Sequence, residues 1–381
     1  MTSLATDWLT SASFARVYFW PFCVALGVTL TAVPIVRGIA VRLGLFDRPD
    51  AGLKPHEKPI PYLGGVGIYF GWLAALAWSI PVAGAARSQV GWIAAGGTVL
   101  MLTGLIDDIR HLPPRTRLVI QALVAGGLVY GGVGDAVSPS LLWPLRTDLP
   151  DWLLSGITAK ALSWLVCAFV IAGATNSTNL IDGLDGLCGG VVAISSAGFL
   201  AINACAAGNL APGDGSELVR SAVCVGAMGA CLGFLVYNFN PASIFMGDSG
   251  SLLLGYNAAL AMILFAQHPT WKWLAGAVMV FGFPIFDTAL AITRRWLNGR
   301  PLFVGDRSHF YDQLRDRGLS VRQTVLVCYL IGLILAVMGA VLVTLPTACL
   351  VIVLCLMPVL AFLLCWRQGM LRVDDSAQRS G

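Results

Sequence analysis

The stretch Asn176-Ser177-Thr178-Asn179-Leu180-Ile181-Asp182-Gly183-Leu184-Asp185-Gly186-Leu187 lies between two apolar runs, at about 160–175 and 187–205. A helix needs about 20 predominantly apolar residues to cross a bilayer. Two such runs joined by a short polar segment predict two membrane helices connected by a turn at the membrane surface.

The polar residues of this turn are regularly spaced. Asn176, Asn179, Asp182 and Asp185 follow one another at intervals of three, so consecutive members fall on neighbouring positions of a helical or turn-like surface. Carboxylate and amide oxygens suit a hard cation such as Mg²⁺, with Mn²⁺ as an alternative. The simpler alternative is a polar turn with glycines at its corner. Two Asp and two Asn at fixed spacing favour a site.

Composition places the whole chain in the membrane. Of its 381 residues, 57% are hydrophobic and only 12% are charged, and the mean hydropathy is +0.78. Soluble domains carry about 25% charged residues. We therefore expect an all-α, polytopic integral membrane protein that forms a single domain over 1–381, with a short disordered tail from about 367.

Apolar runs recur along the entire chain. We predict eleven transmembrane helices, at 18–36, 62–82, 90–106, 117–134, 160–175, 187–205, 218–237, 250–267, 271–293, 324–345 and 347–366. The ends of each span are uncertain by about 2–4 residues.

The loops after the odd-numbered spans emerge on one side of the membrane, and nearly all polar motifs lie in them. That side and the C-terminal tail carry 18 Lys and Arg, whereas the opposite side carries six of the 24 in the chain. By the positive-inside rule, the motif side is cytoplasmic, the N-terminus is outside and the C-terminus is inside.

Two acidic motifs stand at helix ends on this side. Asp107 and Asp108 end the third span, and adjacent residues diverge on a helix, so one is free to face a site while the other caps or pairs, for example with Arg117. Asp248, in Met246-Gly-Asp-Ser-Gly-Ser251, opens the eighth span, where a simple N-cap is the alternative to metal ligation.

The last loop on this side combines an intramembrane acid with basic residues. Asp287 lies inside the ninth span, either as a functional carboxylate or as the partner of an Arg or a helix end. Arg300, Arg307 and His309 follow, and Arg binds phosphate bidentately while His donates hydrogen bonds or shuttles protons. This grouping fits pyrophosphate binding.

A basic, proline-rich loop precedes the second span. Lys54 and His56 stand in Lys54-Pro-His-Glu-Lys-Pro-Ile-Pro61, either as ordinary positive-inside charge or to capture a phosphate at the membrane surface. Acidic residues suited to a metal, basic residues suited to phosphates and an adjoining bilayer together suggest phosphoryl transfer between a soluble phosphoanhydride and a lipid phosphate.

The ordered motifs resemble those of the polyprenyl-phosphate N-acetylhexosamine-1-phosphate transferases, particularly the bacterial undecaprenyl-phosphate N-acetylglucosamine-1-phosphate transferase branch. The resemblance runs from about Phe46 to Leu314. The five motifs that carry it are Lys54 to Gly65, Gly104 to Asp108, Asn176 to Gly186, Met246 to Ser251, and Pro284 to Asp287 with Asp306 to His309.

The resemblance implies a bacterial inner-membrane enzyme that moves a sugar-1-phosphate, in this branch GlcNAc-1-phosphate, from a UDP-sugar to polyprenyl phosphate, with Mg²⁺ as cofactor and UMP as product. This is a first membrane step of envelope glycan synthesis. It implies no nucleic-acid partner, and it leaves the oligomeric state open, with a homodimer among the alternatives.

Roles carry over by position. The resemblance implies that Asp248, Asn179 and Asp182 hold the metal and that Asp107, Asp108, Asp248 and His309 are catalytic. It implies substrate contacts from Lys54, His56, Arg117, Asn176, Asn179, Asp182, Asp185, Arg300 and Arg307.

The sequence departs from the pattern of this branch at one place, which bears on the sugar of the UDP-sugar donor. The branch commonly carries a His-x-His or triple-His cluster in the last loop, whereas this chain reads Ser308-His309-Phe310-Tyr311-Asp312. The donor sugar is therefore left open among UDP-N-acetyl sugars.

Two other classes of membrane protein fit the sequence less well. A transporter or lipid flippase would place its binding residues near the bilayer midplane in repeats, and this chain has its acids at span ends and no evident repeat. A CDP-alcohol phosphotransferase would show an Asp-Gly-x-x-Ala-Arg opening, which the Asp182-Gly183 motif lacks.

Overall fold

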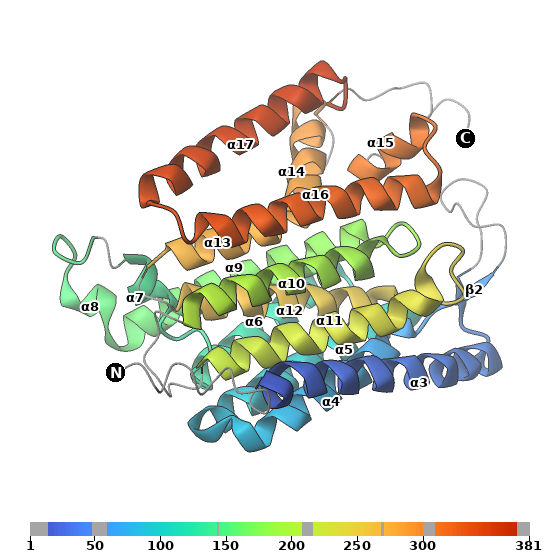
Figure 1. Ribbon diagram of the computed structural model, residues 1–381, viewed down its shortest axis with the longest axis horizontal. Helices are drawn as coiled ribbons and strands as arrows, with labels where there is room; N and C mark the ends of the chain where they lie inside the picture. Colours follow the sequence, from blue (N-terminus) through green and yellow to red (C-terminus); the bar gives the residue numbers. More distant parts are fainter. Residues whose placement is uncertain are drawn as a thin grey trace.

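A computed structural model describes residues 14–47, 59–142, 145–207, 216–267, 270–299 and 309–371. Apart from β1 (Phe46–Asp47) and β2 (Ile60–Pro61), which pair antiparallel, the regular structure of these residues is helical. Figure 1 shows the long helices running side by side in one bundle. The expected all-α membrane architecture is confirmed.

Each of the eleven predicted spans coincides with helix. The corresponding helices are α3 (Trp20–Leu43), α4 (Gly64–Ser79), α5 (Arg87–Arg110), α6 (Pro114–Tyr130), α9 (Gly156–Ile181), α10 (Leu187–Ala207), α11 (Ser216–Asn238), α12 (Gly247–Ala266), α13 (Lys272–Val280) with α14 (Gly282–Leu297), α16 (Val321–Leu342) and α17 (Thr347–Arg367). The short helices α7 (Val137–Leu142), α8 (Asp151–Leu154) and α15 (Phe310–Asp316) lie between them.

The predicted count of eleven is not confirmed. Within the described residues, eight helices are long and apolar enough to cross a membrane, and nine if a bent pair is one span. The helices α4 and α6 have 16 and 17 residues, fewer than the 18 required of a candidate membrane span. The predicted span 271–293 is not straight: α13 and α14 meet at an angle of 73°.

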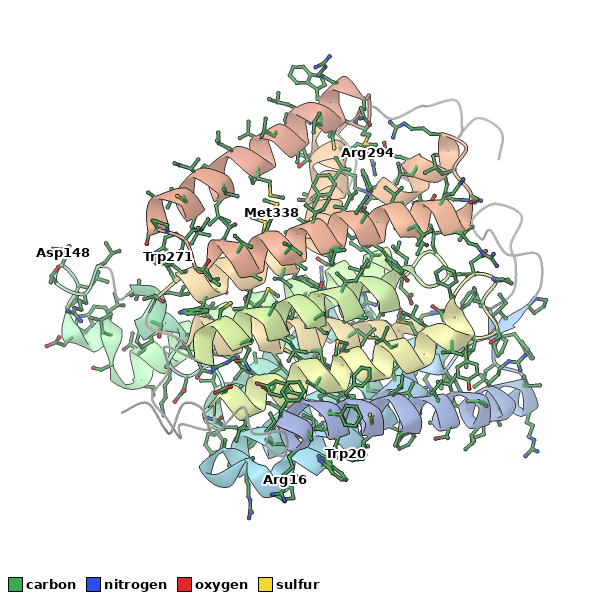
Figure 2. All side chains as sticks on the ribbon, in the orientation of Figure 1. Arg16, Trp20, Asp148, Trp271, Arg294 and Met338 are labelled. Carbon is green, nitrogen blue, oxygen red and sulfur yellow. The ribbon has the colours of Figure 1, made fainter. Side chains whose placement is uncertain are left out.

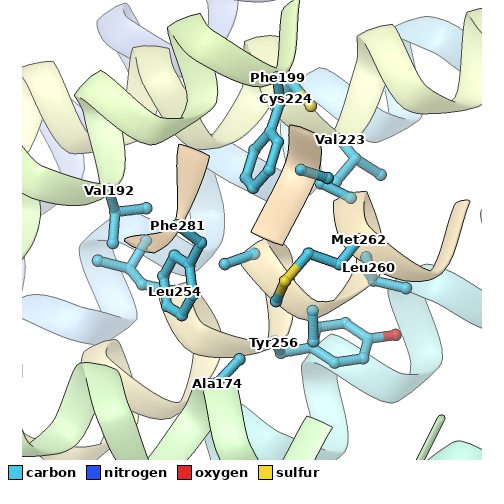
Figure 3. Close-up of a cluster of buried hydrophobic side chains, with 14 of the residues drawn as sticks. Ala174, Val192, Phe199, Val223, Cys224, Leu254, Tyr256, Leu260, Met262 and Phe281 are labelled. Carbon is cyan, nitrogen blue, oxygen red and sulfur yellow. The ribbon is translucent and has the colours of Figure 1, made fainter. Parts of the chain in front are cut away.

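The core of the bundle is formed around α12. Every residue from Ser249 to Ala266 is buried, and α12 packs against α4, α5, α9 and α11. Figure 3 shows Leu254, Tyr256 and Met262 of this helix among side chains that include Phe199 of α10 and Cys224 of α11. A helix that is apolar on all sides is stable only when it is surrounded, and α12 meets this condition.

One buried polar contact joins α4 to α12 inside the core. The indole nitrogen of Trp72 in α4 donates to Oδ1 of Asn257 in α12 at 2.8 Å. Peripheral helices instead point apolar side chains outward, as Figure 2 shows around the rim of the bundle. In lipid, such outward apolar faces are expected.

One end of the bundle gathers the polar motifs. The helices α5, α9 and α11 end there, and α6, α10 and α12 begin there, at the right of Figure 1. We call this the site end. The three loops that join these helices were all predicted to share one side of the membrane, and they do meet at one end.

Candidate active site

A cavity of about 830 Å³ opens at the site end. Its walls come from β1 and β2, from the ends of α5, α9 and α11, and from the starts of α12 and α16. Of the residues predicted for a site, six line it: Asp107, Asp108, Asn179, Asp182, Asp185 and Asp248. Segments that are far apart in the sequence therefore converge as predicted.

Asp107 has a structural role at the end of α5. Its side chain is buried, with 5% of the residue exposed. Oδ1 accepts a hydrogen bond from the Leu112 amide at 2.6 Å, and Oδ2 accepts one from Nη1 of Arg117 at 2.8 Å. The carboxylate thus closes the turn between α5 and α6 and holds the Arg117 guanidinium.

Asp108 holds the first turn of α12. Its Oδ1 accepts from the Asp248 amide at 2.8 Å and its Oδ2 accepts from the Ser249 amide at 3.2 Å. The first amides of a helix have no partner within the helix, and a carboxylate there also opposes the positive end of the helix dipole. The N-cap alternative considered for Asp248 is therefore wrong: its amide is capped, and the capping residue is Asp108.

The approach of α5 to α12 depends on a glycine. A Cβ atom at Gly104 would overlap the carbonyl group of Asp248 and the amide nitrogen of Ser249. The motif Gly104-Leu-Ile-Asp107-Asp108 thus combines a small residue that permits contact with the carboxylate that exploits it.

The Asp248 carboxylate points to Asn179 and Arg117. Asn179 donates from Nδ2 to Asp248 Oδ1 at 2.6 Å and to Ser251 Oγ at 3.1 Å. Its side-chain carbonyl oxygen, Oδ1, has no hydrogen-bond partner in the described residues. Nη1 of Arg117 lies 3.5 Å from Asp248 Oδ2. One guanidinium therefore bridges Asp107 and Asp248.

Asp182 differs from the other acids. Its carboxylate has no hydrogen bond or ion pair with any part of the chain that the structure describes. Burial raises the pKa of Asp182 well above its usual range, and the charges of Asp248, Asp108 and Asp185 raise it further. A cation or a proton at this carboxylate would offset that cost.

The other two members of the spaced row have structural partners. Asp185 accepts from Nδ2 of Asn240 and from the Ala242 amide, both at 2.9 Å, and so holds the loop before α12. Asn176 donates to the Ala172 carbonyl of its own helix at 2.7 Å and does not line the cavity. Three of the four residues therefore reach the cavity.

His309 is placed by Asp287. Its Nδ1 lies 2.7 Å from Oδ2 of Asp287, which is fully buried, and Oδ1 of Asp287 accepts from the Phe310 amide at 2.6 Å. Of the two roles considered for Asp287, the structure shows the partner of a helix end, here the start of α15. Burial alone would lower the pKa of His309, but the hydrogen bond to Asp287 and its charge raise it.

His309 does not line the cavity but adjoins its wall. Its ring stacks on Tyr311, with centroids 5.6 Å apart and an interplanar angle of 6°. The Tyr311 hydroxyl donates to the Leu180 carbonyl at 3.1 Å, beside the Asp182 loop. The predicted residues Lys54, His56, Arg300 and Arg307 lie outside the described residues.

Several cavity residues were not predicted. Tyr62 and Phe245 form a parallel backbone bridge and both line the cavity, as do His111, Asn238 and Asn240. The available signal was position, because Tyr62 and Phe245 directly precede the glycine motifs of α4 and α12.

The cavity has the donor chemistry of a hard cation but no complete metal site. Among the described residues, no three His, Cys, Asp or Glu side chains converge as a metal cluster. The unpartnered carboxylate of Asp182, the Asp248 carboxylate and the free carbonyl of Asn179 nevertheless fit Mg²⁺, which takes one or two carboxylates and leaves its other positions to water and substrate phosphates.

Comparison with known proteins identifies relatives across most of the chain. The model of glycosyl transferase family 4 matches residues 90–266. A probable undecaprenyl-phosphate N-acetylglucosaminyl 1-phosphate transferase of Bacillus subtilis is 36% identical over 84% of this chain and 84% of its own length.

Two further relatives carry related names. A decaprenyl-phosphate N-acetylglucosaminephosphotransferase of Mycobacterium tuberculosis is 33% identical over 80% of this chain and 77% of its own length. A phospho-N-acetylmuramoyl-pentapeptide-transferase of a Synechococcus species is 32% identical over 74% of this chain and 78% of its own length.

The His309–Asp287 pair predicts a pH dependence of stability. Because the folded-state pKa of His309 is raised above 6.5, the stabilisation is fully present below about pH 6.5 and is lost as pH rises through the folded pKa. Asp287→Asn should remove this loss, so that the midpoint of thermal unfolding in detergent varies less with pH above 6.5. An equally steep pH dependence in the variant would contradict the pairing.

Proposed function

This chain belongs to glycosyl transferase family 4, and we propose that it transfers a sugar phosphate from a nucleotide sugar to a polyprenyl phosphate in the membrane. The names of two relatives give transfer of N-acetylglucosamine phosphate with undecaprenyl or decaprenyl phosphate, and the name of the third gives transfer of phospho-N-acetylmuramoyl-pentapeptide. The observation that carries the proposal is the cavity at the site end, which is lined by the carboxylate of Asp182, unpartnered in the described residues, and by that of Asp248, which is paired with Arg117.

The finer assignment is GlcNAc-1-phosphate from UDP-GlcNAc, with UMP as the leaving group. Two of the three relatives named above act on N-acetylglucosamine, and the one with the highest identity of the three carries undecaprenyl phosphate in its name. Another UDP-N-acetyl sugar is the alternative, because the last loop retains only His309 of the histidine cluster.

For the cofactor we propose Mg²⁺, with Mn²⁺ as the alternative, held by Asp182, Asp248 and Asn179. When bound, such an ion neutralises phosphate charge and polarises the transferring phosphoryl group. The chain supplies the oxygen ligands: Asp182 has no competing partner in the described residues, and Asn179 presents a free carbonyl oxygen.

The reaction exchanges one phosphoanhydride for another. A lipid phosphate oxygen forms a bond to the sugar-linked phosphorus, the bond from that phosphorus to the bridging oxygen breaks, and UMP leaves with that oxygen. A phosphate monoester has a second pKa of about 6, so at neutral pH the nucleophile is largely deprotonated and needs no general base. Positioning and charge stabilisation then account for most of the catalysis.

The acids of α5 act as positioning residues in this account. Both oxygens of Asp107 are engaged by Leu112 and Arg117, and both oxygens of Asp108 are engaged by the start of α12. Arg117, held by Asp107, stands 3.5 Å from Asp248, where it can meet a phosphate. Arg300, Arg307, Lys54 and His56 remain predicted phosphate contacts.

We further propose that the site end faces the cytoplasm of a bacterial inner membrane, with the N-terminus outside and the C-terminus inside. The loops and tail on this side carry 18 of the 24 Lys and Arg, as the positive-inside rule requires. Nucleotide sugars made in the cytoplasm would then reach the cavity directly.

The sidedness is tested with membrane vesicles. Inverted vesicles should release UMP from externally added UDP-GlcNAc, whereas right-side-out vesicles should do so only after permeabilisation. Equal release by sealed vesicles of both orientations would contradict the proposed topology.

The activity is tested by UMP release from purified protein with Mg²⁺, undecaprenyl phosphate and a panel of UDP-sugars. Asp182→Asn should lower turnover by about 100-fold or more, because it removes the uncompensated charge at the proposed metal. The matched control is Asp148→Asn, an exposed acid outside the cavity.

We expect the wild type to release UMP only when both lipid and Mg²⁺ are present. We expect this release to be lost in Asp182→Asn and kept in Asp148→Asn. No release with any donor would contradict the transferase and favour a transporter. Wild-type turnover in Asp182→Asn would contradict the role of Asp182.

A further inference from the structure

The last long helix, α17, is packed in an unusual way. It is the most apolar of the membrane-length helices, with a mean hydropathy of 3.0 over its window, yet only 11% of that window is buried. Figure 1 shows it inclined away from α16 along most of its length. At its end, however, Cys365, Met370 and Leu371 are at most 6% exposed. Apart from Leu350 near its start, the helix is therefore buried only where it stops.

A specific C-terminal motif produces this buried end. Gly369 adopts a left-handed conformation with φ of 72°, the Met370 amide donates to the Cys365 carbonyl at 2.9 Å, and the Gly369 amide donates to the Trp366 carbonyl at 3.0 Å. These two bonds define a Schellman motif, in which the chain reverses after a glycine. The sequence was predicted to be disordered from about 367, and the structure instead describes an ordered turn to Leu371, which we call the C-terminal turn (Gln368–Leu371).

The carbonyl groups of the C-terminal turn are bound by side chains from two other elements. Nδ2 of Asn298, just after α14, donates to the Leu371 carbonyl at 3.1 Å. From α15 and the residue that follows it, Gln313 donates to Met370 at 3.2 Å and Arg317 donates to Gln368 at 2.9 Å. Three hydrogen bonds therefore tie α17 to both α14 and α15.

Apolar packing supports the same connection. Cys365, Met370 and Leu371 form a small hydrophobic cluster with Leu290 of α14, separate from the main core, and Phe310 packs against it. Phe310 is the first residue of α15 and donates its amide to Asp287. The cluster therefore packs against Phe310, the residue that directly follows His309.

The helix α15 is too short to hold itself in place. It has seven residues, and its first turn is fixed by Asp287 and by the bond from Tyr311 to Leu180. Its second half, with Gln313 and the following Arg317, is held by the C-terminal turn. Loss of that turn would remove two hydrogen bonds from this end of α15 and leave it held only by its packing on the main core and its connection to α16.

We propose that the C-terminal turn is a positioning element for the reaction, which fixes α15 and thereby His309 beside the cavity. The inference rests on the proposed function for its kinetic test, and it goes beyond that function by assigning a role to a segment remote from the substrates.

The test uses a backbone substitution at Gly369. A Cβ at this position has no atom within 4 Å, so Gly369→Ala acts through its conformation alone. An L-residue other than Asn is disfavoured in the left-handed region, and the turn should be populated about fivefold less or worse. We expect Gly369→Ala to lower kcat for UMP release about fivefold, and Gly369→Asn to stay within about twofold of wild type. Leu360→Ala, at an exposed site of α17, is the control and should not change kcat.

A double-mutant cycle separates positioning from general destabilisation. If the turn acts through His309, Gly369→Ala should cost less than about twofold in a His309→Asn background, because coupled residues are not additive. The same fivefold cost in both backgrounds, or no cost in the wild-type background, would overturn the proposal.

Hydrogen exchange supplies a readout that does not depend on turnover. Amides of 309–317 should exchange faster in Gly369→Ala than in wild type, while those of α12 should be unchanged. Equal exchange of 309–317 in Gly369→Ala and wild type would overturn the positioning role, even if the wild type released no UMP. If exchange is faster in Gly369→Ala but the wild type releases no UMP, the result counts only against the proposed function. Where His309→Asn turns over too slowly to measure, exchange decides.

Discussion

The carboxylate of Asp108 makes the contact on which the rest of the site depends. It accepts the amides of Asp248 and Ser249, residues 140 and 141 positions away, and so joins the end of α5 to the start of α12. The helix α12 is surrounded by protein from Ser249 onward, and at its start the Asp108 side chain satisfies two of the first amides, which have no partner within the helix. This cap sets the position of Asp248, and Asn179 and Arg117 are then arranged around Asp248.

The acids of the site divide into two groups by their partners. Asp107, Asp108 and Asp185 accept hydrogen bonds that close turns or cap a helix. Asp182 has no hydrogen bond or ion pair in the described residues, and Asp248 accepts from Asn179 and pairs with Arg117. Hydrogen bonds hold the carboxylates of Asp107, Asp108 and Asp185 in place without removing their charge, so a cation bound in this acidic cavity would offset the repulsion between the acids. Figure 1 places the end of α5, the turn between α9 and α10, and the start of α12 at the same end of the bundle.

Much of this arrangement could be predicted from the sequence, because hydropathy and loop order depend on local composition. Both located the helices and the shared face of the motifs correctly. The differences arose where a tertiary partner decides the outcome. Regular spacing could not show that Asn176 bonds to its own helix while Asp182 has no partner in the described residues. Apolarity alone could not show the bend at Phe281, or the buried turn after Arg367 that ends a helix otherwise facing lipid.

The central claim is that Asp182, which has no partner among the described residues, binds the cation that the reaction needs. The most direct measurement is Mn²⁺ binding to the purified protein in detergent, followed by electron paramagnetic resonance, with and without UDP. The account predicts one bound ion per chain whose affinity rises with UDP and is lost in Asp182→Asn, with Asp148→Asn unchanged. Equal affinity in wild type and Asp182→Asn would contradict it.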